Sequence, residues 1–426
     1  MKRVLIIAYM FPPLGGGGVQ RTLKFVKYLP DYGWKPLVIA GINDYYTKDP
    51  SLKKEIPEEA EVERIRAFEF LNFYHKLERL GLHKLASAFD KITSIPDGKF
   101  IWGKRVLSRV QESKERFEAI DAIYATGPPF TNFRVGKALK ENLGDPLILD
   151  YRDEWTSSPL YKSNLFSRLK KPIEKRMENN CVRAADILIC LNNGMKNQLL
   201  SRQESLTPGK IYTIPNGFDK TDFKGLGHSN GSLLLEDDFN IVYTGSFYGK
   251  QNPRNFFAAL ETIMDENAKV RKRVQIHLIG NVETPYVRKI TEGESRLSQA
   301  INLHGYLAHR ESTRYLKEAD VLLLIIGRTE GSERIFTGKL FEYLAVKKPI
   351  LGIVPPTGAA ANVMHETKSG VVANHAEVGD IKAKIKDLYE GWKKDFKNFQ
   401  PDEEAISNYE REKLTEKLAK VLDELV

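Results

Sequence analysis

The sequence predicts an α/β protein with two domains, each built around a parallel β-sheet. Three observations predict this fold. The chain has 426 residues, which is enough for two domains of ordinary size. Short apolar runs alternate with amphipathic, helix-like segments over most of the chain, as is typical of βαβ units. The alternation forms two series, separated by a segment rich in Gly, Pro, Asn and Ser at 207–231.

The apolar runs predict the individual strands. In the first series we expect strands at Val4–Tyr9, Pro36–Ala40, Ala122–Ala125, Leu147–Asp150 and Ile187–Leu191. In the second series we expect them at Asn240–Thr244, Gln275–Ile279, Val321–Ile326, Ile350–Ile353 and Gly370–Ala373. The last segment, Glu403–Val426, has apolar residues at helical spacing. We therefore expect one domain at 1–207 and a second at 208–402.

Composition excludes several classes of protein. Hydrophobic residues make up 42% of the chain and charged residues 28%, so it is neither disordered, collagen-like nor disulfide-stapled. Cys181 and Cys190 match no zinc-site spacing, indicate a reducing compartment and are expected in the core. The longest apolar run, about seven residues, is too short to span a bilayer. We interpret the basic and apolar N-terminus as a buried strand rather than a secretion signal.

The net charge of +9 is concentrated in two basic stretches. Residues 76–114 carry nine Lys or Arg against four Asp or Glu, and residues 162–183 carry seven against two. This local excess predicts a surface that meets an anionic partner. The aromatic and leucine-rich segment within 71–114 has two interpretations. It is an amphipathic helix packed on its own domain, or an interfacial helix beside anionic lipid headgroups.

Four consecutive glycines, Gly15–Gly18, separate the first expected strand from a helix-like segment. Glycine lets a backbone approach a ligand closely, and a helix N-terminus attracts phosphate. Gly17 and Gly18 are therefore candidates for contact with an anionic substrate. The spacing matches neither the dinucleotide fingerprint nor the P-loop, which disfavours NAD binding and ATP hydrolysis. A tight turn is the alternative interpretation.

Charged and aromatic residues follow the fourth expected strand. Asp150, Arg152, Asp153 and Trp155 lie at its carboxyl end, where open parallel sheets bind ligands. We take them as candidate acceptor-side residues. An internal Asp–Arg salt bridge is the alternative, and both interpretations can hold together.

A third group follows the first strand of the second series. Gly245 and Ser246 come directly after that strand, and Lys250 and Arg254 follow in the loop and at the start of a helix. Cations at this place can neutralise phosphates. A basic pair without a binding role is the alternative.

A fourth group follows Val321–Ile326. Thr337 and Gly338 open a helix whose N–H groups can face a diphosphate. Lys339 and Glu342 lie three residues apart on one face of this helix, and the carboxylate can accept hydrogen bonds from sugar or ribose hydroxyls. A surface ion pair between the two is the alternative.

Taken in order, these segments resemble the family-4 glycosyltransferases of the GT-B fold. The resemblance spans nearly the whole chain and rests on FPPLGGGGVQR, IPNGFD, YTGSFYGK, LHGYLAHRESTRYLKEADVLLL, TGKLFEYLAVKKPIL and GAAANVMHETKSGVVA. ATGPPF and DYRDEW are similar to one branch of that family. The resemblance implies two Rossmann-like domains facing a central cleft, with the acceptor held mainly by the first and a nucleotide-sugar donor mainly by the second. It also implies that 403–426 packs back onto the first domain.

The resemblance further implies roles for single residues. Gly17 and Gly18 would approach the donor phosphates or the acceptor. Lys250, with Arg254 in reserve, would neutralise the diphosphate. Tyr306 would lie in the loop beside the base.

In the same way, Gly338 and Lys339 would lie at the phosphate-binding helix start. Glu342 matches the second glutamate of the family's Glu-x7-Glu motif, which contacts the nucleotide ribose. The first glutamate of that motif is replaced by Arg334. Glu333 is therefore our candidate for its sugar-contacting role.

We accordingly expect a cytoplasmic enzyme at the inner face of the membrane. It would transfer a hexose, with retention of configuration and without a metal or other cofactor, to a lipid-linked saccharide in cell-surface polysaccharide or glycoconjugate synthesis. Its partners would be the nucleotide sugar, the acceptor and an anionic membrane surface, and no nucleic acid. Two alternatives are a nucleotide-sugar epimerase or other GT-B enzyme, and a nucleotide-binding protein without catalysis.

Overall fold

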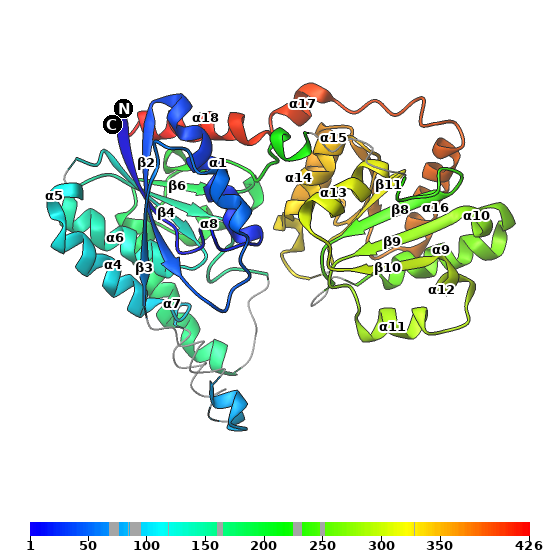
Figure 1. Ribbon diagram of the computed structural model, residues 1–426, viewed down its shortest axis with the longest axis horizontal. Helices are drawn as coiled ribbons and strands as arrows, with labels where there is room; N and C mark the ends of the chain where they lie inside the picture. Colours follow the sequence, from blue (N-terminus) through cyan, green and yellow to red (C-terminus); the bar gives the residue numbers. More distant parts are fainter. Residues whose placement is uncertain are drawn as a thin grey trace. The chain divides into compact units, whose positions relative to one another are not determined.

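The computed structural model describes residues 1–67, 76–83, 85, 95–117, 119–159, 165–224, 232–247, 252–327 and 329–426. The chain forms two compact units, each a parallel sheet covered by helices (Figure 1). Unit 1 consists of Met1–Asn216 and Arg411–Val426, and unit 2 consists of Gly217–Glu410. Two parallel-sheet α/β domains are the fold class that the sequence predicts, so that prediction is confirmed.

The sheet of unit 1 has seven strands in the order β3-β2-β1-β4-β5-β6-β7. They are β1 (Lys2–Ile7), β2 (Trp34–Ile42), β3 (Glu61–Arg66), β4 (Ala122–Gly127), β5 (Leu147–Tyr151), β6 (Ile187–Cys190) and β7 (Ile211–Thr213). The described α-helices of this unit are α1 (Gly17–Tyr28), α4 (Phe100–Glu112), α5 (Lys114–Phe117), α6 (Thr131–Leu143), α7 (Leu165–Ala184), α8 (Asn193–Arg202) and α18 (Arg411–Asp423). Val4 and Ile6 of β1 share one apolar core cluster with Leu23 of α1 and Leu418 of α18. The last helix of the chain therefore completes the core of the first unit.

The sheet of unit 2 has six strands in the order β10-β9-β8-β11-β12-β13. They are β8 (Phe239–Thr244), β9 (Val274–Ile279), β10 (Ile301–Gly305), β11 (Val321–Ile325), β12 (Ile350–Val354) and β13 (Gly370–Asn374). The described α-helices are α9 (Arg254–Glu266), α10 (Ala268–Arg273), α11 (Pro285–Thr291), α12 (Arg296–Ala300), α13 (His309–Glu318), α14 (Gly338–Val346), α15 (Ala359–Glu366), α16 (Val378–Trp392) and α17 (Glu403–Ser407). One core cluster contains residues of α9 and α16, and the other contains residues of α13, α14 and α15. The sheet is therefore buried on both faces.

Both sheets have the doubly wound order of Rossmann-like folds, in which the strand order reverses at one point. In unit 1 the reversal lies between β1 and β4, and in unit 2 it lies between β8 and β11. Open α/β sheets bind ligands outside the carboxyl ends of the strands at such a switch point. The loops after β1, β4, β8 and β11 are therefore the places to look for a site.

Three observed strands, β3, β7 and β10, are absent from the predicted set. All three lie at an edge of their sheet. An edge strand is less enclosed than a central one, so it tolerates polar residues. β3 shows this, because its sequence EVERIR is mostly charged and hardly apolar.

The unit boundaries differ from the expected domains. Because β7 pairs with β6, unit 1 continues past residue 207 and ends at Asn216. Within 403–426, α17 belongs to unit 2, and the residues from Arg411 onward belong to unit 1. Most of the aromatic segment expected as a helix around 71–92 lies outside the described residues. Among the residues that the structure does describe, no helix is both long and apolar enough to cross a bilayer.

Candidate functional site

At the switch point of unit 2, a lysine of α14 reaches the end of β8. Lys339 Nζ donates a hydrogen bond to Tyr243 Oη at 2.6 Å and lies 4.2 Å from the centre of that ring. Tyr243 Oη in turn donates to the carbonyl oxygen of Ser246 at 3.1 Å. Burial lowers the pKa of Lys339 to about 8, although the Glu342 carboxylate opposes this effect. A partly buried ammonium is therefore held at the carboxyl end of β8.

Two glycines make room for this arrangement. Gly245 has a φ of +120°, and a Cβ built on it would lie 2.2 Å from Lys339 Cε. Gly280, which follows β9, has a φ of +112°, and its Cβ would lie 2.2 Å from the carbonyl oxygen of Gly245. A side chain at either position would strain the backbone and displace its neighbour. Gly245 therefore lies against Lys339, and its predicted role in donor binding stays a prediction.

The first turn of α14 lacks a side-chain cap. Its N-cap residue, Thr337, makes no capping hydrogen bond, and Thr337 Oγ1 is buried with no hydrogen-bond partner within the described part of the chain. Gly338 begins the helix and is exposed. The N–H groups of an uncapped first turn carry partial positive charge and can bind phosphate oxygens. Glu342 follows one turn later and is half-buried.

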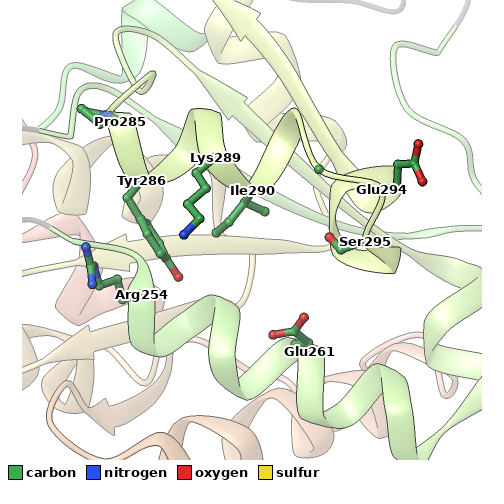
Figure 2. Close-up of a pocket in the computed structure, with 9 residues that line it drawn as sticks. Arg254, Glu261, Pro285, Tyr286, Lys289, Ile290, Glu294 and Ser295 are labelled. Atoms are coloured by element: carbon green, nitrogen blue, oxygen red, sulfur yellow. The ribbon is translucent and has the colours of Figure 1, made fainter.

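Arg254, the first residue of α9, is engaged in a different contact. Its guanidinium lies 4.5 Å from the centre of the Tyr286 ring of α11, and both line a surface groove between α9, α11 and the residues before α12 (Figure 2). The groove also contains Glu261 and Lys289. Its lining does not include Lys339 or Gly245. Apart from Arg254, this groove therefore contains none of the predicted donor residues.

The remaining predicted donor residues are not joined to Lys339 by any contact that the structure describes. Glu333 is exposed and forms an ion pair with Arg334 at 2.8 Å. Tyr306 is 84% exposed after β10 and is available to a ligand. Lys250 lies outside the described residues. The roles given to these three residues stay predictions.

At the switch point of unit 1, Arg152 connects the first turn of α1, which follows β1, to the loop after β4. Its guanidinium donates hydrogen bonds to the carbonyl oxygens of Gly18 and Pro128. Gly17 begins α1 and is exposed. The structure therefore brings Gly17, Gly18 and Arg152 together. Asp153, the next residue of the loop, is exposed and can face a ligand.

Asp150 faces the interior of unit 1. It is 0% exposed, and its carboxylate accepts two hydrogen bonds from Arg21, at 2.8 and 2.9 Å, and one each from Tyr124 and Thr126. Burial alone would raise the pKa of Asp150, but the Arg21 charge and these hydrogen bonds lower it below its usual value. The salt-bridge interpretation therefore describes this residue, with Arg21 as the partner. The acceptor-side role of Asp150 stays a prediction.

Trp155 is also a packing residue. It is 3% exposed and stacks on Phe130, with the ring centres 4.6 Å apart and the planes 1° from parallel. Its position fixes the loop after β5, which carries Arg152 and Asp153. Of the four predicted acceptor-side residues, Arg152 lies at the switch point and Asp153 is exposed to solvent.

A histidine pair between β9, β10 and α13 was not among the predicted site residues. His277 Nε2 lies 3.2 Å from Asn240 Oδ1, His277 Nδ1 lies 3.1 Å from His304 Nε2, and His304 Nδ1 lies 3.3 Å from Tyr315 Oη. Since Asn240 Oδ1 can only accept, His277 must carry a proton on Nε2 and accept at Nδ1 from the Nε2–H of His304. Burial lowers the pKa of His277 to about 4, and it also lowers the pKa of His304. This chain of hydrogen bonds is complete only when His277 is neutral, because its Nδ1 must accept the proton of His304 Nε2.

Two family models match the chain. The family described as Glycosyltransferase Family 4 matches residues 15–222, and the family described as Glycosyl transferases group 1 matches residues 238–391. With the two doubly wound sheets, these matches define a glycosyltransferase of the GT-B type. The chain belongs to the family-4 glycosyltransferases, as its motifs predict.

The chain is also similar to individual proteins. It is 23% identical, over 220 residues, to TuaH of Bacillus subtilis (strain 168), which is named as a teichuronic acid biosynthesis glycosyltransferase. The match covers 50% of this chain and 51% of TuaH, so the chain spans about half the length of that relative.

Solved structures share the whole fold. Anabaena HepE in complex with UDP is 14% identical with a TM-score of 0.65, and the match covers 100% of this chain and 100% of that chain. Sucrose-phosphate synthase of Thermosynechococcus elongatus is 14% identical with a TM-score of 0.66, with 100% of this chain and 99% of that chain covered. At these identities the similarity establishes a common fold.

Proposed function

We propose that the protein transfers a hexose, with retention of configuration, from a nucleotide sugar to a saccharide acceptor in cell-surface polysaccharide synthesis. The observation that carries the proposal is the fixed ammonium of Lys339 beside the uncapped first turn of α14. Breaking a sugar–phosphate bond builds negative charge on the leaving diphosphate. A preorganised cation and helix N–H groups stabilise such charge without reorganisation during the reaction. Membership of the family and the name of TuaH support transfer into a polysaccharide.

In this proposal unit 2 holds the donor and unit 1 holds the acceptor. Lys339 and the backbone of Gly338 bind the diphosphate, and Glu342 binds the ribose. Arg152 and Asp153, next to the glycine loop, contact the acceptor. The leaving diphosphate takes the proton of the attacking hydroxyl. Because Lys339 and the helix supply the positive charge, we propose that no metal ion is needed.

A thermal-shift measurement with UDP, GDP, ADP and their sugar conjugates tests the donor assignment. It is made in EDTA to exclude bound metals. UDP is the first nucleotide to test, because the HepE structure contains it. At 100 times its dissociation constant, a ligand of the folded state stabilises by about 2.7 kcal/mol. We expect one nucleotide to give a shift that Lys339→Gln reduces, and no shift with any nucleotide at millimolar concentration would contradict the proposal.

Product analysis separates transfer from the alternative reactions. We expect sugar from the labelled nucleotide sugar to appear in an acceptor, with the same anomeric configuration as in the donor. Conversion of the donor to an epimer without any acceptor would indicate an epimerase instead. We further propose that the acceptor is lipid-linked and that the enzyme works at an anionic membrane. Label that partitions into an organic extract of membranes would support this acceptor class.

A further inference from the structure

The exposed leucine and isoleucine side chains of unit 1 lie within its two basic stretches. Among the described residues of this unit, every leucine or isoleucine with a largely exposed side chain lies within 76–114 or 162–183. These residues are Leu80, Leu82, Leu85, Leu169 and Ile173. Exposed apolar groups that gather in one region mark an interaction surface.

The two basic stretches differ in how their charges are used. In the first, Arg109 forms an ion pair with Glu63 of β3 at 2.5 Å, and Arg105 donates to the carbonyl oxygen of Arg66 at 2.6 Å. These contacts attach α4 to the sheet edge. Part of the positive charge in this stretch is therefore already neutralised within the unit.

In the second stretch, which forms most of α7, some of the exposed basic residues are not neutralised in this way. Its two acidic residues, Glu174 and Glu178, are 1% and 0% exposed. Its exposed charged residues are all basic. Within the described ranges, Arg168, Lys175 and Arg176 have no ion-pair partner. Because the acids are buried, the outer face of this helix carries only positive charge.

Two aliphatic side chains lie among these cations. Leu169 is 68% exposed and Ile173 is 50% exposed, and their spacing of four residues places them on the same side of the helix. Arg168 precedes the first and Arg176 follows the second by less than one turn. A helix face that combines exposed aliphatic groups with basic groups has the character of an interfacial membrane helix.

We propose that this face of α7 binds the surface of an anionic lipid bilayer. The α7 face consists of Arg168, Leu169, Lys171, Ile173, Lys175 and Arg176. The aliphatic side chains enter the headgroup region, and the cations bind lipid phosphates. A dissolved polyanion would leave the aliphatic groups in water, and an apolar protein patch would leave the cations unpaired. The inference deepens the proposed function and rests on it, since it names the surface that would bring the enzyme to a lipid-linked acceptor.

Sedimentation with lipid vesicles tests this proposal. Vesicles of phosphatidylcholine with 30% phosphatidylglycerol are compared with pure phosphatidylcholine at 100 mM salt. We expect the full-length protein to bind only the anionic vesicles. Leu169→Ser/Ile173→Ser should weaken binding at least tenfold with every charge retained. Arg168→Gln, Lys175→Gln and Arg176→Gln should each weaken it about fivefold, from about 1 kcal/mol per basic residue.

Matched substitutions elsewhere serve as controls. Leu235→Ser removes an aliphatic side chain that is 70% exposed in unit 2, and Lys394→Gln/Lys397→Gln removes exposed charges there. Neither control should change vesicle binding. Retained binding in Leu169→Ser/Ile173→Ser would overturn the proposal, because a partner that binds only the cations does not need the aliphatic groups. The thermal shift with nucleotide is measured on every variant. If the wild-type protein does not bind anionic vesicles but shows the nucleotide shift, only the α7 proposal is overturned. If the nucleotide shift is absent, the proposed function is contradicted.

Discussion

At the scale of single residues, the contact between Lys339 and Tyr243 links the fold most directly to the proposed chemistry. Tyr243→Phe removes the acceptor that holds the ammonium and keeps the buried ring. A hydrogen bond to a charged group contributes about 1.5–3 kcal/mol, so we expect kcat to fall at least tenfold with a smaller change in KM. Steady-state kinetics measures both values. Tyr389→Phe, another buried tyrosine of unit 2, is the control and should retain wild-type rates.

The lowered pKa of Lys339 predicts a pH dependence of donor binding. The cation binds the diphosphate, and it is lost as the pH rises through its pKa of about 8. We therefore expect the affinity for the nucleotide diphosphate to decrease from pH 7 to pH 9.5. Lys339→Arg keeps the charge over this range and should flatten the profile. Calorimetric titration measures it, and a flat wild-type profile would remove Lys339 from diphosphate binding.

Asp150 and Asp153 give a third test at this scale. Asp150→Asn leaves the Arg21 charge buried without its partner, and such a loss destabilises a protein by about 3–5 kcal/mol. Desolvation raises the pKa of Asp153 to about 6, so Asp153→Asn removes an unfavourable charge and should not destabilise the protein. Chemical denaturation measures both. If Asp150→Asn proved as stable as the wild type but inactive, the structural assignment of Asp150 would be wrong.

At the scale of elements, central strands could be predicted from the sequence and edge strands mostly could not. A central parallel strand is buried on both faces and reads as an apolar run, as in VLLLI of β11. β3, β7 and β10 lie at edges and lack such a run, and only one edge strand, β13, was predicted. Local patterns report burial, and burial is weakest at an edge. This is why the boundary of unit 1 was placed before β7.

The histidine pair that links β9, β10 and α13 makes unit 2 sensitive to acid. The pKa of His277 is about 4 in the folded protein, against about 6.5 in the unfolded chain, so its contribution is present above pH 6.5 and is lost as the pH falls toward 4. Between pH 7 and pH 5, His277 alone should reduce stability by about 2 kcal/mol.

Thermal unfolding at a series of pH values measures this loss. His277→Gln/His304→Gln should make the stability of unit 2 less dependent on pH between 7 and 5. His309→Gln, which changes an exposed histidine of α13, should keep the wild-type slope. An unchanged slope in the double variant would show that the pair does not control acid sensitivity.

At the scale of the whole molecule, the sequence was informative where a site is made by neighbouring residues. Thr337, Gly338, Lys339 and Glu342 were predicted together because they form one continuous helix start. Tyr243 was missed because it lies 96 positions from Lys339, and Arg21 was missed because it lies 129 positions from Asp150. Pairings over such distances depend on the strand order, which periodicity does not specify.

A substitution in α18, the last helix of the chain, tests whether the two units unfold independently. Leu418 of α18 is 1% exposed within the core of unit 1, although the segment before it belongs to unit 2. Leu418→Ala should therefore destabilise unit 1 by about 2–5 kcal/mol and leave unit 2 unchanged. Lys417→Ala, at the exposed neighbouring position, should affect neither unit.

Calorimetry with and without nucleotide distinguishes the units in this experiment. Because a ligand stabilises only the unit that binds it, the transition raised by nucleotide belongs to unit 2 under the proposed function. Leu418→Ala should lower the other transition. If it lowered the nucleotide-sensitive transition instead, either the donor would bind unit 1 or α18 would not stabilise unit 1. Leu344→Ala, which truncates a fully buried residue of unit 2, decides between these outcomes by showing which transition belongs to that unit.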